Sequence, residues 1–211
     1  SDAHPVTLSA TIRDLGASPS IAAELQWPKG VLTLSGRPRP DRFTIDASEL
    51  TLHTSTLRLK GDVMLDAKEP SQLSLQGVLE PAELTQIPWL KFETFDPSLI
   101  KGPLSLSVQF RGSPNDWQSA AAEGWVTAPQ VVVNDIPFDN VRLEFDQSQR
   151  ALRLRLPQGR LADGTIWGDG AIEYQPEGQQ YLIQTEFTSV QLARLAEIIP
   201  SWQQRAIKGS A

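Results

Sequence analysis

The chain has 211 residues, enough for one domain or two small ones, and its 40% hydrophobic content is that of a folded globular protein rather than a disordered one. Its 25 acidic and 19 basic residues give a net charge of −6, which argues against nucleic-acid binding because such proteins carry basic patches. Cysteine is absent, which excludes disulfides, thiol catalysis and cysteine metal sites.

The first eighty residues predict a series of short β-strands. Apolar and polar residues alternate through 6–13, and further strands are expected at 21–27, 30–36, 43–47, 49–53, 56–65 and 72–79. A period of two is that of a strand with one apolar face, and short strands separated by turn residues indicate an all-β fold. The segment 37–41, Arg-Pro-Arg-Pro-Asp, is expected to be a loop because proline cannot donate to a sheet ladder.

The period changes after residue 80. Pro81 suits the first turn of a helix, and Leu84 and Ile87 lie three residues apart, which together predict a short helix near 81–88. Residues 89–99 are irregular. Clean alternation returns and predicts a strand over 104–112.

The stretch from about 123 to 174 predicts an antiparallel meander with one apolar face and one charged face. Arg142 and Glu144 alternate with apolar residues, and so do Arg153 and Arg155. Turns are expected at 134–135, 146–149, 157–159 and 162–164. A hairpin connection at 175–178, a strand over 181–187 and a second short helix near 190–199 follow, the helix opened by a capping-box sequence at 188–191 and ended by Pro200.

Two parts of the chain match at an offset of 109 residues. Thr56-Leu57-(x)3-Gly61-(x)-Val63 aligns with Thr165-Ile166-(x)3-Gly170-(x)-Ile172, and Leu73 aligns with Leu182. In both copies a short helix, a Pro and Trp pair and an Ile-Lys-Gly sequence follow. We therefore expect an N-terminal β segment at 1–54, a first β repeat at 55–122 and a second β meander at 123–211, from a protein whose repeats build an elongated assembly.

Signs of catalysis are weak. The two histidines, His4 and His53, stand outside any catalytic motif, and Gly168-Asp169-Gly170 lacks the spacing of a calcium loop and is typical of a tightly packed strand. Asp135, Asp139 and Asp146 occupy expected turn positions. We predict that the chain is not an enzyme and that it binds no metal or cofactor.

The six tryptophans could contact sugar or membrane, but structural packing explains them first. They stand at positions 27, 89, 117, 125, 167 and 202. Trp89 and Trp202 follow the two short helices, so they are expected to pack helix against sheet. Trp125 and Trp167 lie within strands and are expected in a core or groove.

The pattern of residues 138–145, 151–154 and 159–170, together with the strand that opens at Ile100-Lys101-Gly102, resembles the AsmA-like proteins, which include the TamB and YhdP groups of the bacterial envelope. The resemblance covers most of residues 50–211. It rests on short alternating strands with glycine at turns, although the Gly-Gly-x-x-x-Gly form of the family is only partly present, since Gly159 and Gly164 stand alone.

This resemblance implies a mostly β fold: an extended, curved antiparallel sheet of repeated meander units, with an apolar groove inside. It implies a periplasmic body that is anchored in the inner membrane by an N-terminal membrane helix, which we expect to lie outside this sequence. The implied role is phospholipid transport between membranes or outer-membrane homeostasis. The implied partners are phospholipid acyl chains and further repeats of the same chain, and we expect this sequence to be a segment of such a longer protein.

Two hypotheses differ in what covers the apolar face. In the first, nine apolar residues line a groove that binds or conducts phospholipid: Leu104, Leu106, Val108, Val141, Leu143, Phe145, Leu152, Leu154 and Leu156. In the second, the chain is a structural spacer or protein-interaction module, and a second sheet or the short helices seal the same residues in a dry core. An open apolar surface would favour the first hypothesis.

Overall fold

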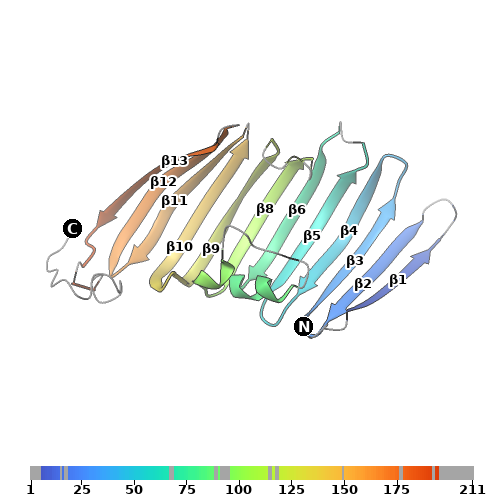
Figure 1. The fold of residues 1–211 in the computed structure, drawn as a ribbon, viewed down its shortest axis with the longest axis horizontal. Coiled ribbons are helices and arrows are strands. Elements are labelled where there is room, and N and C mark those ends of the chain that lie inside the picture. The colour runs from blue at the N-terminus through green and yellow to red at the C-terminus, as the bar shows by residue number, and fades with distance from the viewer. Residues whose placement is uncertain are drawn as a thin grey trace.

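A computed structural model describes residues 6–14, 16, 19–66, 69–87, 90, 96–113, 116, 119–148, 150–175, 178–191 and 193–194. It contains one open antiparallel sheet of 13 strands (Figure 1). Each strand from β1 to β13 pairs with its neighbours in sequence, except that β6 pairs with β8 and the short β7 pairs with β9. The predicted fold class is confirmed, and the sheet is continuous across the predicted segment boundaries near 54 and 122.

The bounds of the elements follow the alternating pattern of the sequence. The first half contains β1 (Thr7–Arg13), β2 (Ser20–Trp27), β3 (Gly30–Pro38), β4 (Arg42–Thr51), β5 (Thr56–Met64), β6 (Ser71–Leu79) and the 3₁₀ helix η1 (Pro81–Gln86). The second half contains the 3₁₀ helix η2 (Pro97–Leu99), β7 (Ile100–Lys101), β8 (Leu104–Gly112), β9 (Ala121–Val133), β10 (Ile136–Ser148), β11 (Ala151–Leu161), β12 (Gly164–Gln175) and β13 (Gly178–Thr188).

The two faces of the sheet differ in chemistry because directly paired residues share a face. One row of paired residues, from β1 to β13, is Ala10, Ala23, Leu34, Ser48, Leu59, Leu75, Val108, Gly124, Phe145, Leu154, Gly170 and Ile183. The neighbouring row, on the other face, is Ser9, Glu24, Thr33, Glu49, Arg58, Gln76, Ser107, Trp125, Glu144, Arg155, Asp169 and Gln184. We call these the apolar face and the charged face.

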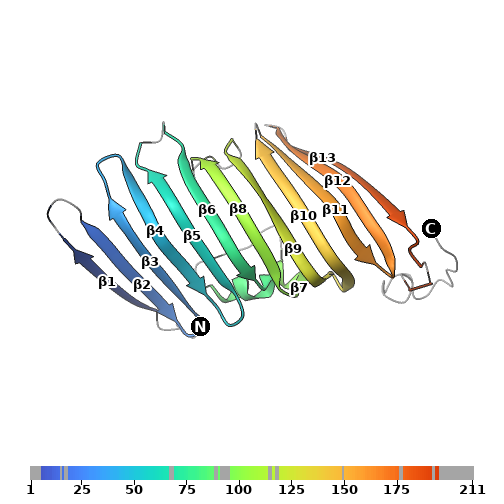
Figure 2. The same cartoon turned by 180° about the vertical axis from the view of Figure 1, so that it is seen from behind.

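The helix η1 covers one end of the apolar face. Ile87, directly after η1, joins Trp27 and Leu52 in a buried cluster, and Leu84 packs against the same cluster. In Figure 1 the helix stands in front of the sheet, so that view looks at the apolar face, and Figure 2 looks at the charged face. The expected helix near 81–88 is thus present as a 3₁₀ helix.

A second cluster occupies the corresponding end of the C-terminal half. Val190, which follows β13, is buried against Leu161 and Ile166. Leu161 stands 109 positions after Leu52, and both are buried where a strand ends before a turn. The sequence repeat is therefore also a structural one. The helix expected near 190–199 lies mostly outside the described residues. Within that range, the described residues Ala193 and Arg194 are helical.

The two repeats hold their caps at the same turn with different chemistry. In the first, the buried carboxylate of Glu83 on η1 accepts hydrogen bonds from Thr54 and Ser55, whose backbone N–H groups donate at 2.9 and 3.0 Å and whose hydroxyls donate at 2.7 and 2.6 Å. In the second, the Arg194 guanidinium pairs with Asp163, the equivalent of Thr54. The turn thus contacts a negative side chain from the cap of the first repeat and a positive one from the cap of the second.

Three local predictions are wrong. Arg37 and Pro38 belong to β3 rather than to a loop, and the two strands expected at 43–47 and 49–53 form the single strand β4, whose pairing with β5 is irregular between Ile45 and Ser48. The turns expected at 146–149 and 157–159 are largely strand, since β10 continues to Ser148 and β11 runs through 157–159. A β-bulge absorbs an extra residue without ending a strand, so a break in alternation does not require a turn.

The irregularity at 157–159 belongs to a kink shared by neighbouring strands. The pairing of β10 with β11 shifts register beside Asn140, which has a positive φ of 50°, and the pairing of β11 with β12 shifts between Leu156 and Gly159. Beyond the kink the alternation is displaced by one residue. As a result Phe138 and Leu161 remain on the apolar face, where they pack near Ile166.

Candidate functional site

The structure places all nine predicted groove residues on the apolar face. Leu104, Leu106 and Val108 lie on β8; Val141, Leu143 and Phe145 on β10; and Leu152, Leu154 and Leu156 on β11. All nine are half-buried. Side chains on a flat face shield their neighbours from water, so this intermediate burial is that of an apolar surface without a second layer.

Strand β9 lies between β8 and β10, and none of its residues is among the nine predicted groove residues. It contributes small residues to the apolar face, among them Ala122, Gly124 and Val126. The Phe145 ring lies over Gly124, where an added Cβ would come within 2.9 Å of the ring. A glycine covered by an aromatic ring keeps the surface apolar and makes it flatter at this position. The predicted meander begins at about residue 123 and so includes this strand, but its small residues give a weak hydrophobic alternation and are not among the predicted groove residues.

The apolar face also extends over the N-terminal half of the sheet. Its members there include Leu25, Leu32, Leu57, Leu59, Leu73 and Leu75. The same period of two that identified the nine predicted residues marks these leucines. The predicted groove residues lie only within 104–108 and 141–156, although the resemblance covers most of residues 50–211.

Coverage of the apolar face is limited to one end of its strands. Among the described residues, no second sheet lies over it, and the caps are the η1 segment and Val190. Figure 1 shows the strands extending well beyond the helical segment that contains η1. An exposed contiguous apolar surface is typical of sites that contact a ligand, a membrane or another protein.

Both edges of the sheet are open. Strand β13 is exposed along its whole length, with Tyr181, Leu182 and Ile183 between 63% and 76% exposed, and β1 is exposed as well. Strand β13 contains no lysine or proline, the residues that commonly protect an edge from further pairing. An additional strand could therefore extend the sheet at this edge.

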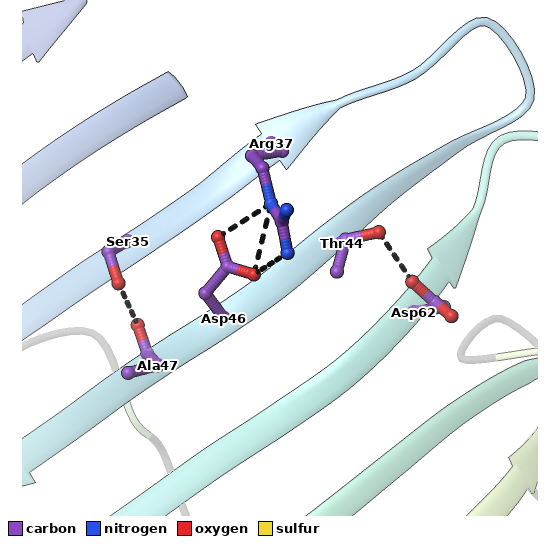
Figure 3. Close-up of polar contacts among 6 residues, drawn as sticks. All are labelled: Ser35, Arg37, Thr44, Asp46, Ala47 and Asp62. Atoms are coloured by element: carbon purple, nitrogen blue, oxygen red, sulfur yellow. Dashed lines mark hydrogen bonds and ion pairs between the residues drawn. The ribbon is translucent and has the colours of Figure 1, made fainter. Parts of the chain in front are cut away.

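The charged face carries polar contacts between neighbouring strands. Arg37 on β3 points toward Asp46 on β4, and its Nε donates to the two carboxylate oxygens at 3.0 and 3.1 Å (Figure 3). This hydrogen bond and the negative charge of Asp46 raise the pKa of Arg37. Thr44 Oγ1 donates to Asp62 at 2.6 Å on the next strand. Such contacts order side chains but contribute little to stability because solvent screens them.

The tryptophans divide between the two faces. Trp27 is buried in the η1 cluster, as structural packing predicts. Trp125 and Trp167 were expected in a core or in the groove, but both belong to the charged face, opposite the nine predicted residues. Trp125 is 38% exposed, and Trp167 Nε1 donates to Glu186 at 2.9 Å. Trp89, Trp117 and Trp202 lie outside the described residues.

The repeat alignment of Leu73 with Leu182 is wrong by one residue. Leu73 pairs with Gly61 on the apolar face, whereas the equivalent Gly170 pairs with Ile183. Leu182 pairs with Ala171 and so lies on the charged face. A shift of one residue in a strand moves a side chain to the opposite face, which an alignment of similar residues does not detect.

The described part of the chain has no group of three or more His, Cys, Asp or Glu side chains placed to hold a metal ion. His53 is exposed just after β4, and His4 lies outside the described residues. Within the same described ranges, no helix has the length and apolar character needed to cross a membrane. Comparison with protein-family models, curated proteins and solved structures finds no match to the chain.

Proposed function

We propose that this chain is a non-enzymatic lipid-binding segment of an AsmA-like protein of the bacterial envelope, and that its apolar face holds phospholipid acyl chains. The observation that carries the proposal is the apolar face itself, which runs across the sheet without a second layer among the described residues. The location in the periplasm, with an anchor in the inner membrane, rests on the sequence resemblance alone.

Acyl chains suit this surface better than a polar ligand does. The apolar face offers Leu, Ile, Val and Phe side chains, and contact with them gains about 0.8 kcal/mol for each CH₂ group removed from water. An acyl chain has no hydrogen bonds to satisfy, so it loses nothing by lying on such a surface. Polar headgroups would remain beyond the strand ends opposite the caps, where water is accessible.

The arrangement also supports movement of lipid across the strands. Each row of the apolar face presents mostly apolar residues from one strand to the next, so a lipid displaced by one strand spacing, about 4.8 Å, meets another largely apolar surface. The open edges at β1 and β13 would let further repeats of the chain extend the same surface. A conduit between membranes requires both properties.

The open edges also favour the second candidate function, a spacer or protein-interaction module. In that case a partner, or residues outside the described ranges, would close the apolar face into a dry core. The two candidates differ in whether the purified protein carries lipid.

Native mass spectrometry with lipid extraction tests the proposal on protein purified from a Gram-negative envelope extract. We expect bound phospholipid in the wild type and about tenfold less in Leu106→Asp, because a carboxylate on the apolar face must be desolvated beside an acyl chain. Ser105→Asp is the matched control, because Ser105 directly precedes Leu106 on β8 but lies on the charged face, where it pairs with Thr127. It should retain the wild-type lipid content.

A lipid-free wild type, together with a Leu106→Asp variant that unfolds, would overturn the conduit and support the closed-core module. Circular dichroism of both variants separates loss of lipid from loss of fold. Changing Leu143 and Leu154 to Asp together should remove lipid in the same way, because both lie in adjacent strands of the same face.

A further inference from the structure

The charged face contains a cavity of about 730 Å³ that the proposed lipid-binding function does not use. It crosses the strands from β8 to β13 and lies between two rows of charged-face side chains. Its floor is the backbone at Gly124, Phe145, Leu154 and Gly170. The cavity therefore lies on the opposite side of the sheet from the proposed acyl-chain surface.

The walls of this cavity include an acidic band on β9 and β10 and a basic band on β11, and Asp169 on β12 lies on the far side of the basic band. On β9 and β10, the half-exposed Trp125 pairs with Glu144, and Glu123, two residues away on the same face, pairs with Asp146. On β11, the next strand, stand Arg153 and Arg155, two residues apart on the same face. The acidic and basic bands are thus one strand spacing apart, about 4.8 Å.

The two basic side chains of the lining form no ion pair among the described residues. Arg142 Nε donates to Glu144 at 2.9 Å, so this carboxylate already has a partner. The ion pairs formed among the described residues include neither Arg153 nor Arg155, although each faces an acidic residue on β10. Both guanidinium groups are exposed and available to a ligand.

The charge balance of the lining selects among ligand classes. Four carboxylates, those of Glu123, Glu144, Asp146 and Asp169, face two guanidinium groups, so the site is net negative and a simple anion would be repelled. A simple cation would leave the two arginines unused. A ligand that carries an ammonium and a phosphate group, linked by two carbons, matches both bands at the spacing of neighbouring strands.

We propose that this cavity binds a phosphorylated amino alcohol, the chemistry shared by a zwitterionic lipid headgroup and its free phosphoamine. The ammonium group lies over the Trp125 ring beside Glu123 and Asp146, since aromatic faces and carboxylates both attract cations. The phosphate lies between Arg153 and Arg155, whose planar donor groups suit phosphate oxygens. Leu182 and Ala171 supply an apolar wall at the far end.

Titration calorimetry with phosphocholine tests the site on the full chain. We expect saturable binding, weakened about tenfold in Arg153→Gln/Arg155→Gln and to a similar degree in Trp125→Ala. Inorganic phosphate alone and choline alone should each bind at least about tenfold more weakly than phosphocholine. Arg160→Gln is the matched control, because Arg160 also lies on β11 and pairs with Asp139 but stands outside the cavity.

Two further arms separate the ligand sources and the two faces. Sedimentation with phosphatidylcholine vesicles that soluble phosphocholine reverses would identify a headgroup, whereas binding of phosphocholine without vesicle binding would identify the free compound. Leu106→Asp should bind phosphocholine as the wild type does, so failure of the acyl-chain proposal leaves this test intact. Equal affinity for phosphate and phosphocholine, or unchanged binding in the double arginine variant, would overturn the site.

Discussion

Replacing Gly61 with Ala is expected to lower the free energy of unfolding by about 3 kcal/mol or more. Gly61 lies on β5 with a φ of 136°, a conformation that residues with a Cβ rarely adopt. An added Cβ would also overlap the carbonyl oxygen of Gln72 on the paired strand β6. Backbone cannot move aside as a side chain can, so the strand pairing itself must be disturbed. Equilibrium unfolding in urea, followed by circular dichroism, measures the change.

Gly170 is the matched control, because it occupies the equivalent position of the second repeat. It has no positive φ, and the nearest atom that an added Cβ would meet is the Leu182 carbonyl oxygen at 3.5 Å, an ordinary contact distance. Gly170→Ala should therefore change stability by no more than about 1 kcal/mol. Equal destabilisation by the two substitutions would mean that Gly61 and Gly170 share one backbone geometry, and it would contradict the explanation by positive φ and backbone overlap at Gly61.

Replacing Glu83 with Ala is expected to destabilise the chain by about 3 kcal/mol. The substitution leaves the backbone N–H groups and hydroxyls of Thr54 and Ser55 without their shared acceptor, in a turn where Ser55 is 1% exposed. It should also free η1 from the end of the apolar face. Thermal unfolding, with the fluorescence of the buried Trp27 in the adjoining cluster as a second probe, measures both effects.

The Glu83 contribution should depend on pH in a defined direction. Burial raises the pKa of Glu83, but the hydrogen bonds from Thr54 and Ser55 outweigh burial and leave its pKa below the ordinary value of 4.5. A lowered pKa stabilises the folded state fully above the pKa of the unfolded chain, and this stabilisation is lost as the pH falls through the folded-state pKa. The stability difference between wild type and Glu83→Gln should thus shrink as the pH falls below 4.5. A difference independent of pH would contradict the role of the ionised carboxylate.

Local chemistry made most of the strands predictable. The expected strand over 104–112 coincides with β8, and the expected turns at 134–135 and 162–164 are present. Asn134, Asp135, Ala162 and Asp163 all have positive φ, as the tight turn of a two-residue hairpin requires. Alternation and turn chemistry act over a few residues, so they can be read without knowing which strands meet.

Bulges and faces were less predictable because they depend on pairing. Pro157 and Gly159 predicted a turn, yet the flanking strands hold this segment in β11 and place its irregularity in a kink. Likewise Leu182 is an apolar residue within an alternating strand, but its pairing with Ala171 sets it on the charged face. Register is a property of two strands, and a single residue of displacement reverses the face.

The sequence by itself determined that the chain forms an amphipathic antiparallel sheet of repeated strands, because a period of two with polar turns leaves few other ways to bury apolar side chains. Only the tertiary structure decided that this sheet has no second layer among the described residues, that η1 and Val190 cap one end of its apolar face, and that Trp125, Arg153 and Arg155 meet around a cavity on the other face. Each of these outcomes depends on contacts between residues far apart in the chain, and an alternating pattern specifies which side chains share a face but not what lies against that face.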